Sequence, residues 1–213
     1  MVFNYDDSKE SHPEVICKLN GKDIENVRSF IYLGSSLNYE ESKTGTSEIE
    51  LRIDSAESAL YKHAKKFFNH NISLKTRVRI MNAIVRSRLI YGCQTWALTS
   101  GLFQRIKVTY SSILRKMTKG GFRRKKDAWS LALSNEAILK LCGTEDIKLF
   151  IRRQQRNYLA HVVRSDDGTL SKQLKFDDHI RRPGRHISME TMVHNHEKLS
   201  RDRFNSLAIN RIF

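Results

Sequence analysis

Three observations predict a mainly α-helical fold with a small β-hairpin before it. Long stretches in the middle of the chain repeat apolar residues every three or four positions, the period of a helix that buries one face. An Asn20-Gly21 pair between two short alternating segments predicts a hairpin turn near the N-terminus. Periodicity is weak after Ser165. We therefore expect a helical bundle, preceded by a hairpin and followed by an irregular basic C-terminal tail.

The overall charge predicts a polyanionic partner. The chain has 213 residues, a formal net charge of +15 and 39% apolar residues, enough for a packed core. Nucleic acid is the first partner to consider and an anionic membrane surface the second. We expect an intracellular protein without a membrane span, because the sequence shows neither a long apolar run nor a signal peptide. The isolated thiols argue against a disulfide framework or a cysteine zinc site; they are Cys17, Cys93 and Cys142.

The N-terminal part is predicted to form short strands. Segments 15–19 and 22–25 flank the Asn-Gly turn, and a third strand is expected over Phe30 to Leu33. The polar stretch from Tyr39 to Thr46 is expected to be a surface loop.

Two long helices are predicted next. Ser47 is the expected N-cap of the first, and Ser73 caps the second. The apolar stripe of the first consists of Ile49, Ile53, Ala56, Leu60, Ala64 and Phe67. The inner face of the second consists of Leu74, Val78, Met81, Val85 and Leu89.

The rest of the chain contains further helix signals. Gly92 is placed where a helix would end in a left-handed residue. A third helix follows, with the apolar positions Leu102, Ile106, Tyr110, Ile113 and Met117. Ser134 opens a short helix, and the segment 144–146 caps another with the line Ile147, Ile151, Gln154, Tyr158 and Val162. One last helix is expected over about 188–208.

Basic side chains form lines on these helices. Residues eleven apart return to nearly the same angle of an α-helix, which groups Lys75 and Arg79 with Arg86, and Arg77 with Arg88. No acidic residue lies between Leu74 and Leu98. A solvated face would usually carry compensating acids, so this pattern favours contact with phosphates. Further basic residues that we expect to contact nucleic acid are Arg123, Arg124, Lys125, Lys126, Arg152, Arg153 and Arg156.

The order of several short motifs resembles the reverse transcriptase of non-LTR (LINE-type) retrotransposons. These are Phe30-x-Tyr32-Leu33-Gly34-Ser35, Glu48-Ile49 with Arg52-Ile53, Arg88-Leu89-Ile90-Tyr91-Gly92 with Thr95-Trp96, and Ile151-Arg152-Arg153 through His161-Val162. The resemblance runs from Met1 to about Arg185, with Ala160 where the family usually has glycine. The polymerase segments that it covers lie downstream of the catalytic centre.

The resemblance implies a role for each segment. Residues 1–46 would be the primer-grip hairpin, with Tyr32, Leu33 and Gly34 supporting the primer end. Residues 47–120 would form the thumb, 121–164 a basic loop with connecting helices, and 165–213 the tail. The implied partners are RNA or an RNA–DNA hybrid, and the palm or endonuclease part of a parent protein.

We expect no catalytic residue and no bound cofactor in this chain, and magnesium only in the parent polymerase. Asp6 and Asp7 follow a tyrosine as in a polymerase metal site, but the flanking apolar strands and the upstream aspartate are missing. His194-x-His196 lacks the further ligands of a zinc site. The alternatives are a non-enzymatic helical interaction module and a decayed reading frame without stable function. A grip hairpin without its palm would leave Phe30, Ile31 and Leu33 exposed.

Overall fold

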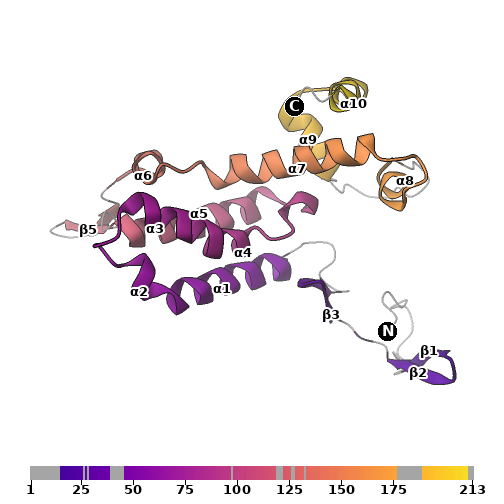
Figure 1. Cartoon of the computed structure of the whole chain (residues 1–213), viewed down its shortest axis with the longest axis horizontal. Coiled ribbons are helices and arrows are strands. Elements are labelled where there is room, and N and C mark those ends of the chain that lie inside the picture. The colour runs from indigo at the N-terminus through magenta and orange to yellow at the C-terminus, as the bar shows by residue number, and fades with distance from the viewer. Residues whose placement is uncertain are drawn as a thin grey trace. The chain divides into compact units, whose positions relative to one another are not determined.

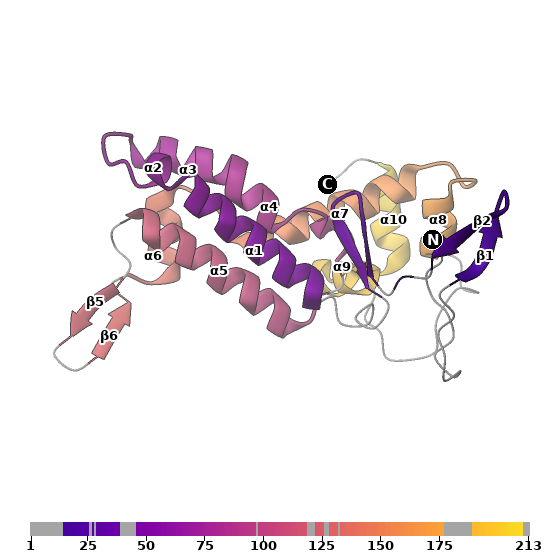
Figure 2. The same ribbon diagram turned by 90° about the horizontal axis from the view of Figure 1, so that it is seen from below.

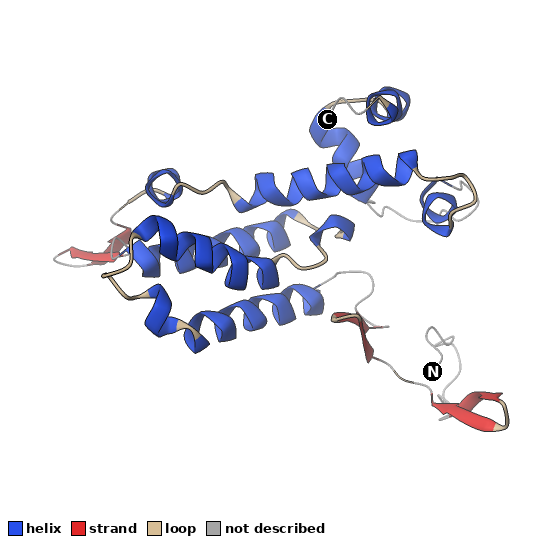
Figure 3. Ribbon diagram, viewed as in Figure 1, coloured by secondary structure: helices blue, strands red, loops and turns tan. Residues whose placement is uncertain are grey.

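A computed structural model describes residues 15–25, 27, 29–38, 46–96, 98–118, 122–125, 128–131, 133–176 and 189–210. The described part is mainly helical, with antiparallel hairpins near the N-terminus (Figure 3), which confirms the predicted fold class. The chain divides into two compact units, residues 1–51 and 52–213. None of the described helices has the length and apolarity of a membrane span.

The first hairpin of the N-terminal unit follows from its Asn-Gly turn. Strands β1 (Val15–Leu19) and β2 (Lys22–Glu25) pair antiparallel. Asn20 and Gly21 join them with positive φ angles of 51° and 77°. Two consecutive positive φ values define a type I′ turn, so the sequence prediction is confirmed at this position.

A second hairpin contains the Tyr-Leu-Gly motif. Strand β3 (Ser29–Tyr32) pairs with β4 (Ser35–Asn38), a strand that the sequence analysis did not predict. Leu33 and Gly34 form the two-residue turn, with φ angles of 49° and 80°. The motif is therefore a hairpin tip, and Leu33 belongs to the turn rather than to the strand.

The second unit contains nearly all the helices (Figure 1), together with the last hairpin. Their bounds are α1 (Thr46–Lys62, which starts in the first unit), α2 (Ala64–Phe67), α3 (Leu74–Met81), a π-helical segment (Asn82–Arg86), α4 (Ser87–Leu89), a 3-10 turn (Cys93–Thr95), α5 (Ser100–Thr118), β5 (Phe122–Lys125), β6 (Ala128–Leu131), α6 (Asn135–Cys142), α7 (Ile147–Arg164), α8 (Leu170–Phe176), α9 (Met189–Glu197) and α10 (Arg201–Ile209).

The first predicted helix is divided into α1 and α2 at His63. Helix α1 begins at Thr46, so Ser47 lies inside its first turn, and its prediction as the N-cap was wrong. The predicted apolar stripe faces inward: Ile49, Ala56, Leu60 and Phe67 are buried, and Ile53 and Ala64 are partly buried.

The second predicted helix starts at the expected cap, because the Ser73 hydroxyl accepts a hydrogen bond from the Thr76 amide at 3.2 Å. Its inner face is buried at Val78, Met81, Val85 and Leu89. A π-helical turn interrupts it at Asn82–Arg86, followed at once by α4. The Ser87 hydroxyl donates back to the Ala83 carbonyl at 2.6 Å, a contact that commonly bends helices.

Helix α5 lies at the centre of the core and packs against α3, α6 and α7. All of its predicted apolar positions are buried, from Leu102 to Met117. The Tyr110 hydroxyl donates to the Asn82 side chain at 3.2 Å and lies 3.0 Å from the Thr144 hydroxyl. These contacts link α5 to the start of the π-helical segment and to the loop before α7.

Helices α6 and α7 have the predicted caps. Ser134 accepts from the Ala137 amide and Asp146 from the Lys148 amide. Gly143 ends α6 in the left-handed region, as Gly92 does after α4. On α7 the buried glutamine is Gln155, not the predicted Gln154.

The segment after Ser165 is more ordered than predicted. It contains α8, α9 and α10 where the sequence suggested an irregular tail with one helix. In both Figure 1 and Figure 2, α9 and α10 lie beside α7. The contact is a buried apolar cluster of Leu159, Ala160, Val163, Val193, Phe204 and Ala208. Helices α9 and α10 are therefore part of the folded core.

Candidate nucleic-acid interface

Lys75 and Arg79 are two exposed residues of the second helix that the sequence predicts to contact phosphates. They lie four residues apart on α3, so their side chains leave the same face on consecutive turns. The first turn of α3 contains no acidic residue, and neither side chain forms an ion pair within the described residues. The two cations repel each other, and Lys75, in the first turn, is also repelled by the positive end of the helix dipole; a bound anion would relieve both repulsions.

Arg77 has a different role from the one predicted. Its side chain is 5% exposed, and its guanidinium donates to three backbone carbonyls: Ile72 at 3.1 Å, Phe67 at 3.1 Å and Met117 at 2.8 Å. The placement of Arg77 on an outer line beside Arg88 was therefore wrong. This arginine joins the loop before α3 to the end of α5, and its donors face protein carbonyls.

The π-helical segment explains why the predicted lines break. A π-helical turn holds one more residue than an α-helical turn, so it rotates the following residues by about 100°. Arg86 is thereby turned inward, with its guanidinium 4.5 Å from the Phe150 ring centroid. Arg88 is turned outward and is exposed, although it lies eleven residues after the buried Arg77. The exposed cations of α3 and α4 are therefore Lys75, Arg79 and Arg88.

Further exposed lysines lie just before α3 and were not among the predicted contacts. Lys62 ends α1, and Lys65 and Lys66 belong to α2, which contacts α3. The sequence contains a signal that could have identified these lysines. They lie in a long stretch almost without acids, because Asp127 is the only acidic residue between Glu57 and Glu136. We use the name "α2–α3 basic surface" for Lys65, Lys66, Lys75 and Arg79.

Three residues of the densest basic run lie on one strand of a hairpin. Arg123, Arg124 and Lys125 belong to strand β5, which pairs with β6 in the register Arg124 opposite Trp129. Lys126 lies outside the described residues. The sequence predicts a loop here, so the strand pairing is a correction, and Arg123, Arg124 and Lys125 belong to one strand.

Two of the three arginines predicted on α7 are paired with acids. Arg153 makes a bidentate contact with Glu145, at 2.8 and 2.6 Å, and lies 5.1 Å from the Phe150 ring centroid. Arg156 lies 3.7 Å from the Glu197 carboxylate. Because their charge is locally compensated, these side chains are weaker candidates for phosphate contact than Lys75 and Arg79.

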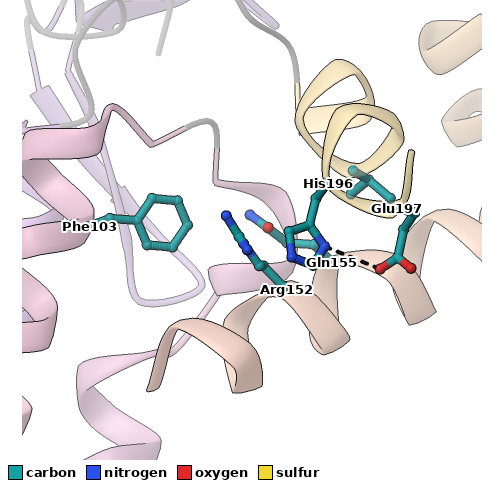
Figure 4. A pocket seen from close by; sticks show the side chains of 6 residues that line it. Phe103, Arg152, Gln155, His196 and Glu197 are labelled. Carbon is teal, nitrogen blue, oxygen red and sulfur yellow. Dashed lines mark hydrogen bonds and ion pairs between the residues drawn. The ribbon is translucent and has the colours of Figure 1, made fainter. Parts of the chain in front are cut away.

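Arg152, the third, faces a pocket between α5, α7 and α9. The pocket encloses about 30 Å³, room for about one water molecule, and is lined by Phe103, Arg152, Gln155, Val193, His196 and Glu197 (Figure 4). Burial lowers the pKa of Arg152, while the nearby Glu197 and Asp146 act in the opposite direction. The sequence pattern does not bring these residues together, because they come from three separate helices.

The predicted primer-grip residues lie at the exposed tip of the second hairpin. Tyr32 is 58% exposed and Leu33 is 75% exposed, and Gly34 completes the turn. Phe30 and Ile31 are also exposed. The predicted exposure of Phe30, Ile31 and Leu33 is confirmed.

The described residues offer no set of ligands for magnesium or zinc. Asp6 and Asp7 lie outside them, and within them no group of three His, Cys, Asp or Glu side chains could hold a metal. The His194 ring packs against Phe204 with centroids 5.3 Å apart, and His196 lies 3.4 Å from Glu197. The donor set in the described part of the chain therefore does not fit the ion that the resemblance implies for the parent.

The two thiols with described side chains are buried. Burial raises the pKa of Cys93 from 9.0 to about 12, and burial also raises the pKa of Cys142. A thiol that stays protonated at neutral pH is a poor nucleophile and a poor metal ligand. Both cysteines therefore act as small core residues.

Comparisons with known proteins give one relative of partial length. The chain is 25% identical over 145 residues to an uncharacterized transposon-derived protein of Caenorhabditis elegans. The alignment covers 68% of this chain and 50% of the C. elegans protein. No protein-family model and no solved structure matches the chain. The chain is therefore related to a transposon-derived protein.

Proposed function

We propose that this chain is the primer-grip, thumb and connecting part of a LINE-type reverse transcriptase, and that it binds template–primer nucleic acid through the phosphate backbone. The relationship to a transposon-derived protein supports the transposon origin. The order of motifs from Tyr32-Leu33-Gly34 to the arginines of α7 supports the polymerase family.

The observation that carries the binding proposal is the α2–α3 basic surface. Its four cations are exposed, and none of them forms an ion pair with another described residue. Rigid helices that present uncompensated Lys and Arg side chains contact phosphates without reading base sequence. A thumb that follows a duplex of any sequence needs this type of contact.

Binding to an RNA–DNA hybrid tests the proposal. We expect the purified chain to bind a blunt hybrid duplex, more weakly as salt rises, and the double variant Lys75→Gln with Arg79→Gln to bind less tightly. The matched control is Lys198→Gln with Arg203→Gln, which removes one exposed Lys and one exposed Arg from the α9–α10 region. Absent or salt-independent binding would contradict the proposal.

The proposal assigns binding, and not polymerisation, to this chain alone. We expect no template-dependent extension of a primer in the presence of magnesium. Extension that is abolished by Asp6→Ala and Asp7→Ala would overturn this part of the proposal.

The exposed β3–β4 hairpin favours a second candidate function, a protein-binding module. Ile31 and Leu33 are 69% and 75% exposed, and apolar side chains at a hairpin tip favour contact with another protein surface. Within the first proposal that surface is the palm or endonuclease part of the parent. If the hybrid does not bind, a non-enzymatic interaction module becomes the better account.

A further inference from the structure

Two buried arginines hold the ends of the β5–β6 hairpin, which connects α5 to α6 (Figure 2). Before the hairpin, the Met117 carbonyl accepts a hydrogen bond from Arg77 at 2.8 Å. After it, the Leu133 carbonyl accepts a hydrogen bond from Arg115 at 2.7 Å. A second donor of Arg115 reaches the Asn135 side chain. The chain therefore leaves the helical core and returns to it at two fixed points.

The charge of these arginines is not neutralised. Arg77 and Arg115 are the charged side chains that are buried in the described part of the chain, at 5% and 3% exposed. Burying a charge is unfavourable unless hydrogen bonds replace its hydration. Both guanidinium groups obtain these bonds from carbonyl and amide oxygens, and neither pairs with an acid among the described residues. The positive charge at the base of the hairpin therefore adds to the potential that attracts an anion.

The segment between the two fixed points is strongly basic. Residues 118–132 contain five Lys and Arg residues and one acid, Asp127. Arg123, Arg124 and Lys125 follow one another on β5. A two-stranded hairpin is only marginally stable by itself, and neighbouring like charges lower its stability further. A polyanion bound along β5 would remove this repulsion.

The base of the hairpin lies beside the α2–α3 basic surface. The Arg77 Nη1 atom donates to the carbonyls of both Met117 and Phe67, so these carbonyls lie within about 6 Å of each other. Phe67 directly follows Lys66 on α2. Strand β5 begins five residues after Met117, and five residues of chain span at most about 18 Å. One turn of a B-form duplex spans about 34 Å, so a single duplex is long enough to contact both elements.

We propose that the β5–β6 hairpin is a fixed second arm of the nucleic-acid interface. Arg123, Arg124 and Lys125 bind the phosphate backbone of the same RNA–DNA hybrid that contacts the α2–α3 basic surface. Arg115 is a positioning residue, because it holds the base of the hairpin and does not contact the nucleic acid. This inference rests on the proposed function, since it adds a second contact to the same duplex.

The salt dependence of hybrid binding tests whether the two basic elements share one duplex. The hairpin variant is Arg123→Gln with Arg124→Gln and Lys125→Gln, and the surface variant is Lys75→Gln with Arg79→Gln. On one shared duplex, the phosphate contacts of both elements contribute to a single salt slope. We expect the slope to decrease by about 3 in the hairpin variant, by about 2 in the surface variant and by about 5 in their combination.

A matched control removes the same charge elsewhere. Arg164→Gln with Lys198→Gln and Arg203→Gln removes two exposed arginines and one exposed lysine from α7 and the α9–α10 region, and should leave the slope unchanged. A slope lowered by only one of the two variants would overturn the shared duplex. If that variant is the surface variant, the proposed function stands, and the basic residues of β5 protect an exposed strand edge instead. Absent binding of the hybrid by the native chain would overturn both proposals.

A double-mutant cycle tests the positioning role of Arg115. Arg115→Gln should weaken hybrid binding about fivefold in the native chain, because a loosened hairpin must be ordered on binding. In the hairpin variant, which lacks the β5 cations, the same substitution should leave the affinity unchanged. An equal loss in both backgrounds would overturn the positioning role, since a purely structural effect does not depend on those cations. If Arg115→Gln does not fold, Asn135→Ala gives the same comparison, because it removes one acceptor of Arg115.

Discussion

The Arg77 guanidinium donates a 2.8 Å hydrogen bond to the backbone carbonyl of Met117, forty residues further along the chain. The same side chain reaches the carbonyls of Phe67 and Ile72. One cation therefore satisfies the carbonyls at the end of α2, in the following loop and near the end of α5. Its charge serves the fold, in contrast with its neighbours Lys75 and Arg79.

A pair of variants separates these roles. Arg77→Gln should lower the free energy of unfolding by about 3 kcal/mol, because buried carbonyls lose charge-assisted donors. Arg79→Gln should change it by less than about 0.5 kcal/mol, as is usual for an exposed position. Urea unfolding followed by circular dichroism measures both. Equal stability of the two variants would contradict the structural role of Arg77.

The C-terminal helices should contribute strongly to stability. Phe204 is fully buried in the cluster that joins α9 and α10 to α7. Phe204→Ala should lower the free energy of unfolding by about 3 to 5 kcal/mol, through lost burial and the cavity left behind. Ile209→Ala is the control, because Ile209 lies on the same helix and is 61% exposed. An unaffected Phe204→Ala variant would mean that this region is a detached tail.

Stability should fall in alkaline solution, in part because of Cys93. Its pKa is raised from 9.0 to about 12 in the folded chain, so the unfolded chain releases the thiol proton first. The thiol contribution is therefore fully present below pH 9 and is lost between about pH 9 and 12, at up to about 1.4 kcal/mol per pH unit. Unfolding measured at several pH values should show a shallower decline for Cys93→Ala. A slope identical to that of the native chain would refute the assignment to Cys93.

Much of the fold was predictable because helix periodicity and capping are local properties. The stripe of α5 and the caps Ser73, Ser134 and Asp146 were located from sequence alone. The hairpin at Asn20-Gly21 was predictable for the same reason, since its turn type depends on two residues.

The failures occur where distant contacts decide the structure. The lines of basic residues assumed an unbroken α-helix, and the π-helical turn after Met81 invalidated that assumption. The burial of Arg77 depends on the Met117 carbonyl, which sequence periodicity cannot locate. The cluster around Phe204 and the pocket around Arg152 both join helices that are far apart in sequence.

The salt dependence of binding to a blunt RNA–DNA hybrid tests the central claim most directly. For the native chain, the logarithm of the affinity should fall linearly with the logarithm of the salt concentration. Each phosphate contact that is removed should reduce the slope by about 1, so Lys75→Gln with Arg79→Gln should reduce it by about 2. The control pair Lys198→Gln with Arg203→Gln should leave the slope unchanged. Equal slopes for the native chain and the Lys75/Arg79 variant would contradict the assignment of the α2–α3 basic surface to nucleic-acid binding.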